Sequence, residues 1–255
     1  CALGFYPQNP GPWFNIWSAV RLANLKTASD LMSVDYVFIF EDKTYAQYDA
    51  DFAKNPNAIT LNLRVNDISK KRVADVFETV FGYPIDIDPT AYVGVGIMKS
   101  NTNGTHDGVI MSFPISAEQV SPSHVYQRLV DSTFTKETSE DLRVAYVLGE
   151  IALVYHKHKP LHDRFGMQYL SVDVKAPLDV FSPNETALIV EFCEAMGLDF
   201  GSVDVMRDKH DGQIYIVDVN KTCMPVLSLP LKTQIKSQKI IAAALTQGLT
   251  RLAQL

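Results

Sequence analysis

Three side chains near the end of the chain have the types and spacing of a metal site. Asp218 and Asn220 lie two residues apart in the apolar segment GQIYIVDVN, so on a β-strand they point to one face. Asp204 lies in the preceding segment, FGSVDVMRD, and the turn sequence HDG predicts a hairpin that brings it alongside them. Two carboxylates and an amide oxygen suit Mg²⁺ that is also held by water and substrate phosphates. The alternative is that both aspartates form ion pairs with nearby Lys or Arg side chains.

The elements before this hairpin predict a small α/β unit followed by a sheet-rich region. Apolar spacing predicts a helix within residues 14–32, and DYVFIF at 35–40 is typical of a strand buried on both faces. A second strand at 58–63 and a helix at 68–81, which Gly82 ends, complete the unit. The residues before 14 are rich in turn formers. We therefore expect an N-terminal lobe spanning 1–90.

After residue 90 the composition favours antiparallel strands. The segments VGVGIMK, GVIMSFP, HVYQRLV, LRVAYVLG and EIALVYHKHK follow one another with short turn-like connections. Ser182 and Glu185 form a capping box that predicts a helix at 182–196, and a terminal helix is expected from about residue 237 to 255. The second region, 91–255, is thus expected to be sheet-rich, and the fold class α+β.

Composition excludes several classes of function. The 255 residues are 47% apolar and 20% charged, as in a globular chain with a sizeable core. The net charge of −6 and the absence of a basic block argue against nucleic acid as a partner. Three separated cysteines favour neither a disulfide framework nor a zinc site. No apolar run approaches the roughly 18 residues of a membrane span, so we expect a cytoplasmic protein with no membrane partner.

The order of motifs resembles the ATP-grasp superfamily over roughly residues 90–225. A capped helix is followed by a G-x-V-D strand, an x-D-G turn and D-x-N, where the family has an acidic residue followed by E-x-N. Upstream, Lys99 precedes the loop SNTNGTHDG, VYQRLVD at 125–131 resembles the adenine hinge, and DLRVAYVLGEIALVYHKHK resembles the family's D-x-R-V strand pair. The group of ribosomal-protein glutamate ligase and glutathione synthetase is the most similar.

The resemblance implies an ATP-grasp fold, a small α/β N-terminal lobe with antiparallel sheets sandwiching ATP. It implies an ATP- and Mg²⁺-dependent ligase, with Mn²⁺ as an alternative metal, which joins a carboxylate to an amine or thiol through an acyl phosphate. Its partners would be a small-molecule carboxylate and amine, or a peptide. The roles implied are catalysis by Arg143 and Lys99, nucleotide binding by Lys99, Gly104, Gly108, Gln127, Arg128, Leu129 and Arg143, and metal binding by Asp204, Asp218 and Asn220.

Departures from the family pattern keep other functions open. Asp218 is one methylene shorter than the expected glutamate, the loop has few glycines, and Gln127 replaces the commoner glutamate. An ATP-dependent small-molecule kinase and a nucleotide-binding regulatory module without turnover are the alternatives. The substrates and the oligomeric state are left open.

Weaker signals surround these motifs. His106 is expected to be solvated, and Cys223 to be buried rather than a nucleophile. Strand alternation puts His156 and His158 on one face and Lys157 and Lys159 on the other. One lysine there, or Arg164, is expected to face phosphate or an anionic substrate while the others are solvated, and a zinc site is not expected. For Lys221, next to Asn220, the sequence favours neither of two roles: contact with phosphate or a substrate carboxylate, or no such contact. Lys70 and Lys71 are expected to be solvated.

Overall fold

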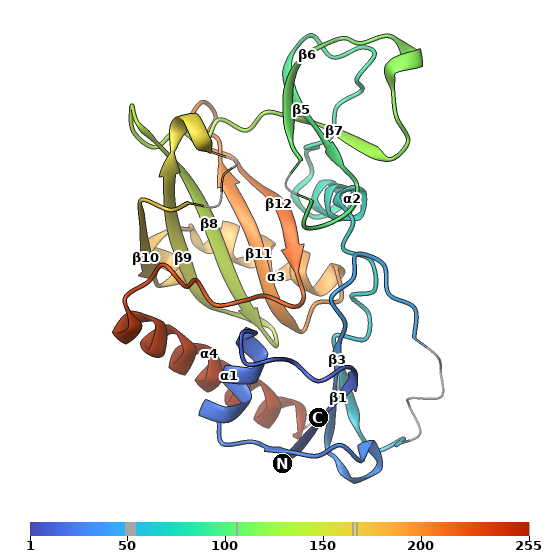
Figure 1. Ribbon diagram of the computed structural model, residues 1–255, viewed down its shortest axis with the longest axis vertical. Coiled ribbons are helices and arrows are strands. Elements are labelled where there is room, and N and C mark those ends of the chain that lie inside the picture. The colour runs from blue at the N-terminus through green and yellow to red at the C-terminus, as the bar shows by residue number, and fades with distance from the viewer. Residues whose placement is uncertain (49–54, 106, 165, 167, 255) are drawn as a thin grey trace.

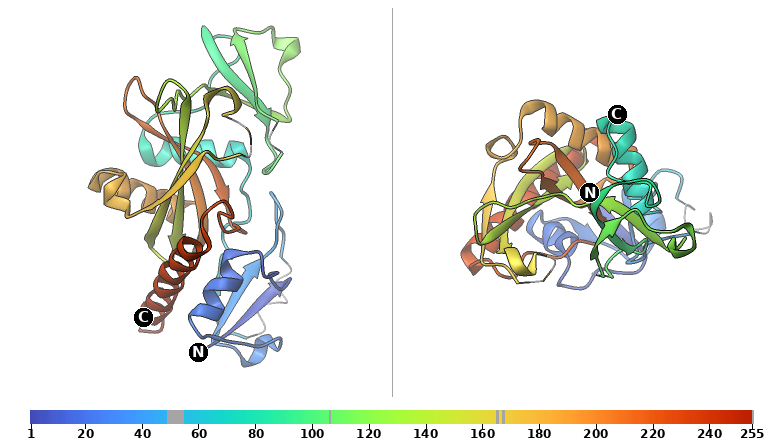
Figure 2. Two further views of the ribbon diagram at one scale, coloured as in Figure 1. Left: turned by 60° about the vertical axis from the view of Figure 1, so that its left-hand side comes forward. Right: turned by 90° about the horizontal axis from the view of Figure 1, so that it is seen from above.

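The computed structural model describes residues 1–48, 55–105, 107–164, 166 and 168–254. These residues form an α+β structure with one parallel and two antiparallel sheets, as the sequence predicts (Figure 1). The two outer sheets lie at opposite ends of an elongated molecule, with the largest sheet between them (Figure 2).

A parallel sheet of order β2-β1-β3-β4 forms the N-terminal end. Its strands are β1 (Ala2–Pro7), β2 (Lys26–Thr27), β3 (Tyr36–Phe40) and β4 (Ile59–Leu61), and every residue of β3 is buried, as its apolar run predicts. β1, which the turn-rich sequence did not reveal, is an inner strand. Helix α1 (Asn15–Leu22) is shorter than predicted because Asn24 adopts a left-handed backbone with φ of 54° and the chain then enters β2.

An antiparallel sheet of order β10-β9-β8-β11-β12 forms the centre. Its strands are β8 (Thr138–Val147), β9 (Glu150–Pro160), β10 (Ser171–Lys175), β11 (Phe200–Arg207) and β12 (Ile214–Asn220), of which β10 was not predicted. Every residue of β11 up to Val205 is buried, because helices cover both faces of this sheet.

Helices cover both faces of the central sheet. On one face lie α2 (Lys70–Phe81) and α3 (Pro183–Ala195), which begins at the predicted capping box of Ser182 and Glu185. On the other lies α4 (Leu231–Leu252), which starts six residues before its predicted beginning, and α1 packs on α4. Because α2 packs on β12 and α3 rather than on the parallel sheet, the lobe boundary at residue 90 stays a prediction.

A small antiparallel sheet of order β6-β5-β7 stands over the other end of the central sheet (Figure 1). It consists of β5 (Gly94–Ser100), β6 (Val109–Phe113) and β7 (His124–Arg128), at the positions that the sequence predicts. Ile97 lies opposite Gln127 and Lys99 opposite Val125. Across the described residues, none of the helices is long and apolar enough to cross a membrane.

Candidate active site

A cavity of about 1070 Å³ lies where the three sheets meet, and it brings the predicted site together. All ten residues proposed from sequence line it: Lys99, Gly104, Gly108, Gln127, Arg128, Leu129, Arg143, Asp204, Asp218 and Asn220. They come from the small sheet, the loop that follows β5, and three strands of the central sheet. Among the described lining residues, eight are basic and five acidic, so the cavity as a whole favours an anion.

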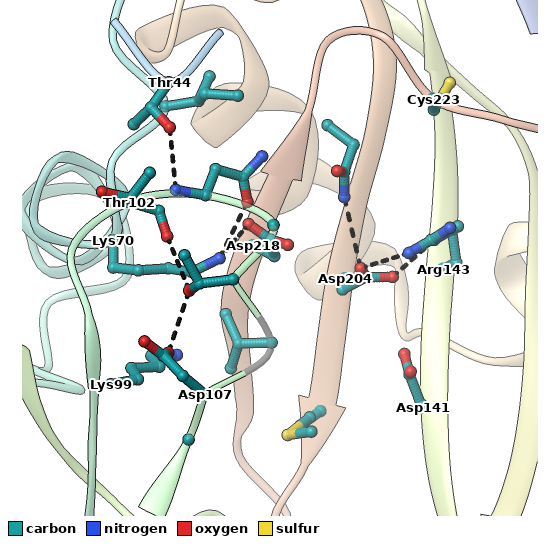
Figure 3. A pocket seen from close by; sticks show the side chains of 18 of the residues that line it. Thr44, Lys70, Lys99, Thr102, Asp107, Asp141, Arg143, Asp204, Asp218 and Cys223 are labelled. Carbon is teal, nitrogen blue, oxygen red and sulfur yellow. Dashed lines mark hydrogen bonds and ion pairs between the residues drawn. The ribbon is translucent and has the colours of Figure 1, made fainter. Parts of the chain in front are cut away.

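The three candidate metal ligands converge on the paired strands β11 and β12 (Figure 3). Asp204 lies opposite Asp218, Ser202 lies opposite Asn220, and a bulge follows Asp204. The amide nitrogen of Asn220 donates to Asp204 Oδ2 at 3.5 Å. The hairpin therefore gathers two carboxylates and an amide, as the spacing predicts.

Both carboxylates nevertheless hold basic side chains, which was the alternative considered from sequence. Arg143 donates to Asp204 through Nε and Nη2, each at 2.8 Å, and Lys157 Nζ lies 3.2 Å from Asp204 Oδ1. Burial alone would raise the pKa of the Asp204 carboxyl, but these two cations outweigh it and hold that pKa well below its usual range. Arg143, expected at phosphate, is turned to Asp204 while still lining the cavity.

The donor set that remains suits a magnesium ion better than a soft metal. Asp218 Oδ1 accepts from Lys70, whereas Asp218 Oδ2 and Asn220 Oδ1 accept no hydrogen bond from another described residue. Within the described part of the chain, no group of three His, Cys, Asp or Glu residues has the geometry of a metal site. Two oxygens from the protein, with Asp204 beside them, match the way Mg²⁺ binds through few carboxylates plus phosphates and water. Their role as ligands stays a prediction.

Lys70 was predicted to be solvated, and that prediction is wrong. Its side chain is buried, and Nζ lies 2.5 Å from Asp218 Oδ1 and 3.1 Å from Asn103 Oδ1. The sequence carried a signal: positions 70, 73, 74 and 77 share one helix face, and the other three are the apolar residues Val73, Ala74 and Phe77. Lys71, one position on, remains exposed and pairs with Asp75, as predicted.

Lys99 and the loop after β5 form the wall opposite strands β11 and β12 (Figure 3). Burial and the neighbouring Lys70 ammonium lower the pKa of Lys99 to about 8. Gly104 has a positive φ of 76°, which favours glycine, and a Cβ on Gly108 would approach Ile97 Cδ1 to 2.8 Å, so a side chain there would require the Ile97 side chain to shift. His106 lies outside the described residues.

The loop is fastened on both sides. Asn103 donates its backbone N–H to Thr44 Oγ1 at 3.0 Å and its side-chain amide to the Val219 carbonyl at 3.3 Å. At the other end, Asp107 accepts from the backbone of Ser100 at 3.1 Å and from Thr105 Oγ1 at 3.0 Å. Backbone groups of this loop are therefore held at the cavity edge, facing strands β11 and β12.

The predicted adenine hinge supplies three kinds of group. The Gln127 side chain is buried, donates to Asp86 Oδ1 at 2.9 Å, and leaves its Oε1 buried without a hydrogen-bond partner among the described residues. Arg128 is directed at Tyr215, with Nη1 2.5 Å from the phenol oxygen. The backbone N–H and C=O of Leu129 make no hydrogen bond to another described residue and lie on the cavity wall. Such an edge can pair with a planar heterocycle.

The lysines of β9 face the cavity and its histidines face away, as alternation predicts. Lys157 lies 2.8 Å and Lys159 3.4 Å from Asp141 Oδ2, and Arg164 lines the same cavity. On the far face the rings of His156 and His158 lie with centroids 4.4 Å apart and planes tilted by 40°. Lys157, Lys159 and Arg164 thus all line the cavity, so the expectation that one of them faces it and the others are solvated is wrong for the others.

Burial decides between the roles considered for two further residues near β12. Cys223 lines the cavity but is 6% exposed, and burial raises the pKa of its thiol, so it lacks the thiolate character of a nucleophile. Lys221 is 3% exposed and is directed at the Val65 carbonyl 3.5 Å away, so it packs beneath the site. Cys223 is therefore buried, as predicted, and Lys221 does not line the cavity.

Comparison with known proteins identifies the fold. No protein-family model and no curated protein matches the sequence. The structure resembles the ATP-grasp ligase PsnB complexed with a phosphomimetic variant of its minimal precursor, Mg and ADP, with a TM-score of 0.61 and 12% identity over 97% of this chain and 98% of that one. It also resembles the macrocyclase MdnC bound with precursor peptide MdnA from Microcystis aeruginosa, with a TM-score of 0.56 and 12% identity over 97% of this chain and 100% of that one.

A third similar structure is the D-cycloserine synthetase DcsG, with a TM-score of 0.54 and 18% identity over 97% of this chain and 99% of that one. These likenesses run through nearly the whole length of both chains, N-terminal sheet included. The chain has the ATP-grasp fold.

Proposed function

We propose that the protein is an ATP- and Mg²⁺-dependent ligase that joins a carboxylate to an amine through an acyl phosphate. The observation that carries the proposal is the single cavity: ten residues chosen from sequence line it, from segments as far apart as Lys99 and Asn220. The solved structures that share the fold include one with Mg and ADP and two named as a macrocyclase and a synthetase, which supports the same class of reaction.

ATP would lie between the small sheet and the central sheet. Its adenine would pair with the Leu129 backbone and stay near the unpartnered Gln127 Oε1, and its phosphates would pass beneath the loop that carries Gly104 and Gly108. Lys99 and Lys70 would bind phosphate oxygens through charge-assisted hydrogen bonds. The buried lysines offset the charge that would otherwise repel a second anion.

Mg²⁺ would be held by Asp218 and Asn220 with Asp204 adjacent. When bound there, it would offset the negative charge that develops on the phosphates during phosphoryl transfer. Entry of the phosphates supplies new anionic partners for Lys70 and Arg143, which now pair with Asp218 and Asp204. The Lys70 and Arg143 side chains would thus exchange their carboxylate partners for phosphate when ATP binds.

The carboxylate substrate would bind near Arg143, Lys157 and Lys159. These side chains lie on neighbouring strands around Asp141 and Asp204, and together they exceed those two acids in charge. A carboxylate held there would face the terminal phosphate, and its oxygen would displace ADP to give the acyl phosphate. Attack by an amine then forms the C–N bond and releases phosphate.

The test measures nucleotide binding and product formation separately. Binding of MgATP should raise the melting temperature, since a ligand at a hundredfold excess over Kd stabilises by about 2.7 kcal/mol, and EDTA should abolish the shift. Phosphate release in the presence of carboxylate and amine panels then distinguishes the ligase, which needs both, from a kinase, which forms ADP without an amine. No metal-dependent shift, or a shift unchanged in Asp218→Ala, would contradict the proposal.

A further inference from the structure

One end of the cavity is lined by residues that the nucleotide and metal do not use. The loop after β1 supplies Trp13 and Phe14, the loop after β3 supplies Asp42–Tyr45, and the segment after β12 supplies Thr222–Met224. The first two loops follow the carboxyl ends of neighbouring parallel strands. Open parallel sheets bind ligands at that edge, so the N-terminal sheet presents a second ligand site to the same cavity.

The surface at this end is aromatic and held in place. Trp13 is 59% exposed, yet its ring lies so close to Gly11 that a Cβ there would come within 2.5 Å of a ring atom. The Phe14 ring packs edge-on against Phe40, with centroids 4.8 Å apart. Tyr45, 54% exposed, lines the same cavity. Burial of such open aromatic surface by a ligand would be favourable.

This end lacks the excess of basic side chains found in the rest of the cavity, since Asp42 and Lys43 are its charged lining residues among those described. The Asp42 carboxylate accepts from Thr222 Oγ1 at 2.6 Å and forms no ion pair with a described Lys or Arg, while Glu41 and Lys43 pair with each other at 2.6 Å. At the other end, basic side chains outnumber acidic ones. The cavity is therefore suited to a polyanion at one end and a cation at the other.

This aromatic end lies beside the groups proposed to hold phosphate and metal. Asp42 contacts Thr222, two residues beyond Asn220, and Thr44, two residues from Asp42, accepts from the backbone of Asn103 in the phosphate loop. Because two residues of fully extended chain span at most about 7 Å, each of these two-residue separations is short. A ligand at Asp42 would therefore be within reach of an acyl group activated at the phosphates.

From this arrangement we infer that the Asp42 end binds the amine co-substrate, a primary ammonium attached to an aromatic or bulky apolar group. The ammonium would lie at the Asp42 carboxylate and the apolar group on Trp13 and Tyr45. Before attack the ammonium would give one proton to Asp42, and the neutral amine would then form the C–N bond and displace phosphate, which carries away the second proton. This inference rests on the proposed ligase function, and it names the chemical class of the nucleophile. Cation–π attraction to the indole would add to the ion pair.

The test uses L-phenylalaninamide as the probe and Trp13 as the reporter. The chain has two tryptophans, so Trp17→Phe leaves Trp13 as the only one, and its fluorescence reports binding directly. We expect saturable quenching by the probe and none by N-acetyl-L-phenylalaninamide, which has no ammonium. In the same background, Asp42→Asn keeps an oxygen for the Thr222 hydroxyl but loses the charge, and binding should weaken about tenfold or more.

The exposed Glu191→Gln, on α3 outside the cavity, is the matched control and should bind like its parent. The MgATP-dependent thermal shift is recorded for each variant and should be unchanged in Asp42→Asn. If the shift persists but the probe fails to bind, or binds Asp42→Asn as tightly as its parent, the inference is overturned and the proposed function stands. Loss of the shift in the parent protein would overturn both.

Discussion

We predict that the ion pair between Lys70 and Asp218 stabilises the folded protein and that its removal changes the response to Mg²⁺. Side chains of the pair are only 10% and 21% exposed, and Lys70→Met keeps most of the volume while removing the charge. Breaking a fully buried pair costs about 3–5 kcal/mol. Because Asp218 keeps some solvent contact and accepts from the Val219 N–H at 3.0 Å, we expect a loss of about 2 kcal/mol in the free energy of unfolding.

The assay is a double-mutant cycle in urea at low ionic strength. Asp218→Asn in the Lys70→Met background removes the uncompensated carboxylate, so it should recover much of the loss and give a coupling energy above about 1 kcal/mol. Mg²⁺ alone should stabilise Lys70→Met more than the parent, since a cation then replaces the ammonium at Asp218. Additive effects of the two substitutions, together with an equal Mg²⁺ response in both proteins, would refute the reasoning.

Three further predictions follow from burial and charge. Because the pKa of Lys99 is lowered to about 8, its ammonium loses its proton as the pH rises through that value, so MgATP affinity should fall between about pH 7 and about pH 9.5. Calorimetric titrations with Lys99→Arg, which stays charged, should show no such fall, and an equal fall in both would contradict the assignment. Phe77→Ala removes a ring at 0% exposure that contacts Phe81, Tyr83 and Tyr215, and urea unfolding should show a loss of about 3–5 kcal/mol. Ser182→Ala removes the N-cap of α3 and should cost about 1 kcal/mol, whereas Ser33→Ala, away from that cap, serves as its control.

Local sequence patterns predicted the elements whose structure depends mainly on residues close together in the chain. The run DYVFIF contains β3, Tyr36–Phe40, in which every residue is buried, and α3 begins at the capping box of Ser182 and Glu185. By contrast, β1 was missed because turn formers follow it closely, and its strand state depends on pairing with β3, which lies about thirty residues away along the chain. The prediction of a long first helix failed for a similar reason: Asn24 leaves the helix so that Lys26 and Thr27 can pair with β1.

The sequence predicted that the candidate residues lie together and offered ion pairs of the two aspartates as an alternative, but it did not predict which basic side chains form those pairs. Spacing on two strands is enough to place Asp204, Asp218 and Asn220 together, because a hairpin fixes their register. No local pattern could show that Asp218 meets Lys70, since the two are 148 positions apart and meet only when α2 packs on β12.

Basic side chains stabilise the two neighbouring carboxylates of this site in the folded chain. Two carboxylates placed side by side for a metal would repel each other whenever no cation is present, and burial would make that repulsion worse. Here Arg143, Lys157 and Lys70 supply the missing positive charge from three different elements. Under the proposed function, the same cations would become available to phosphate when nucleotide and metal bind together. We therefore expect metal binding to be weak without nucleotide and strong with it, because only the nucleotide gives the displaced cations new partners.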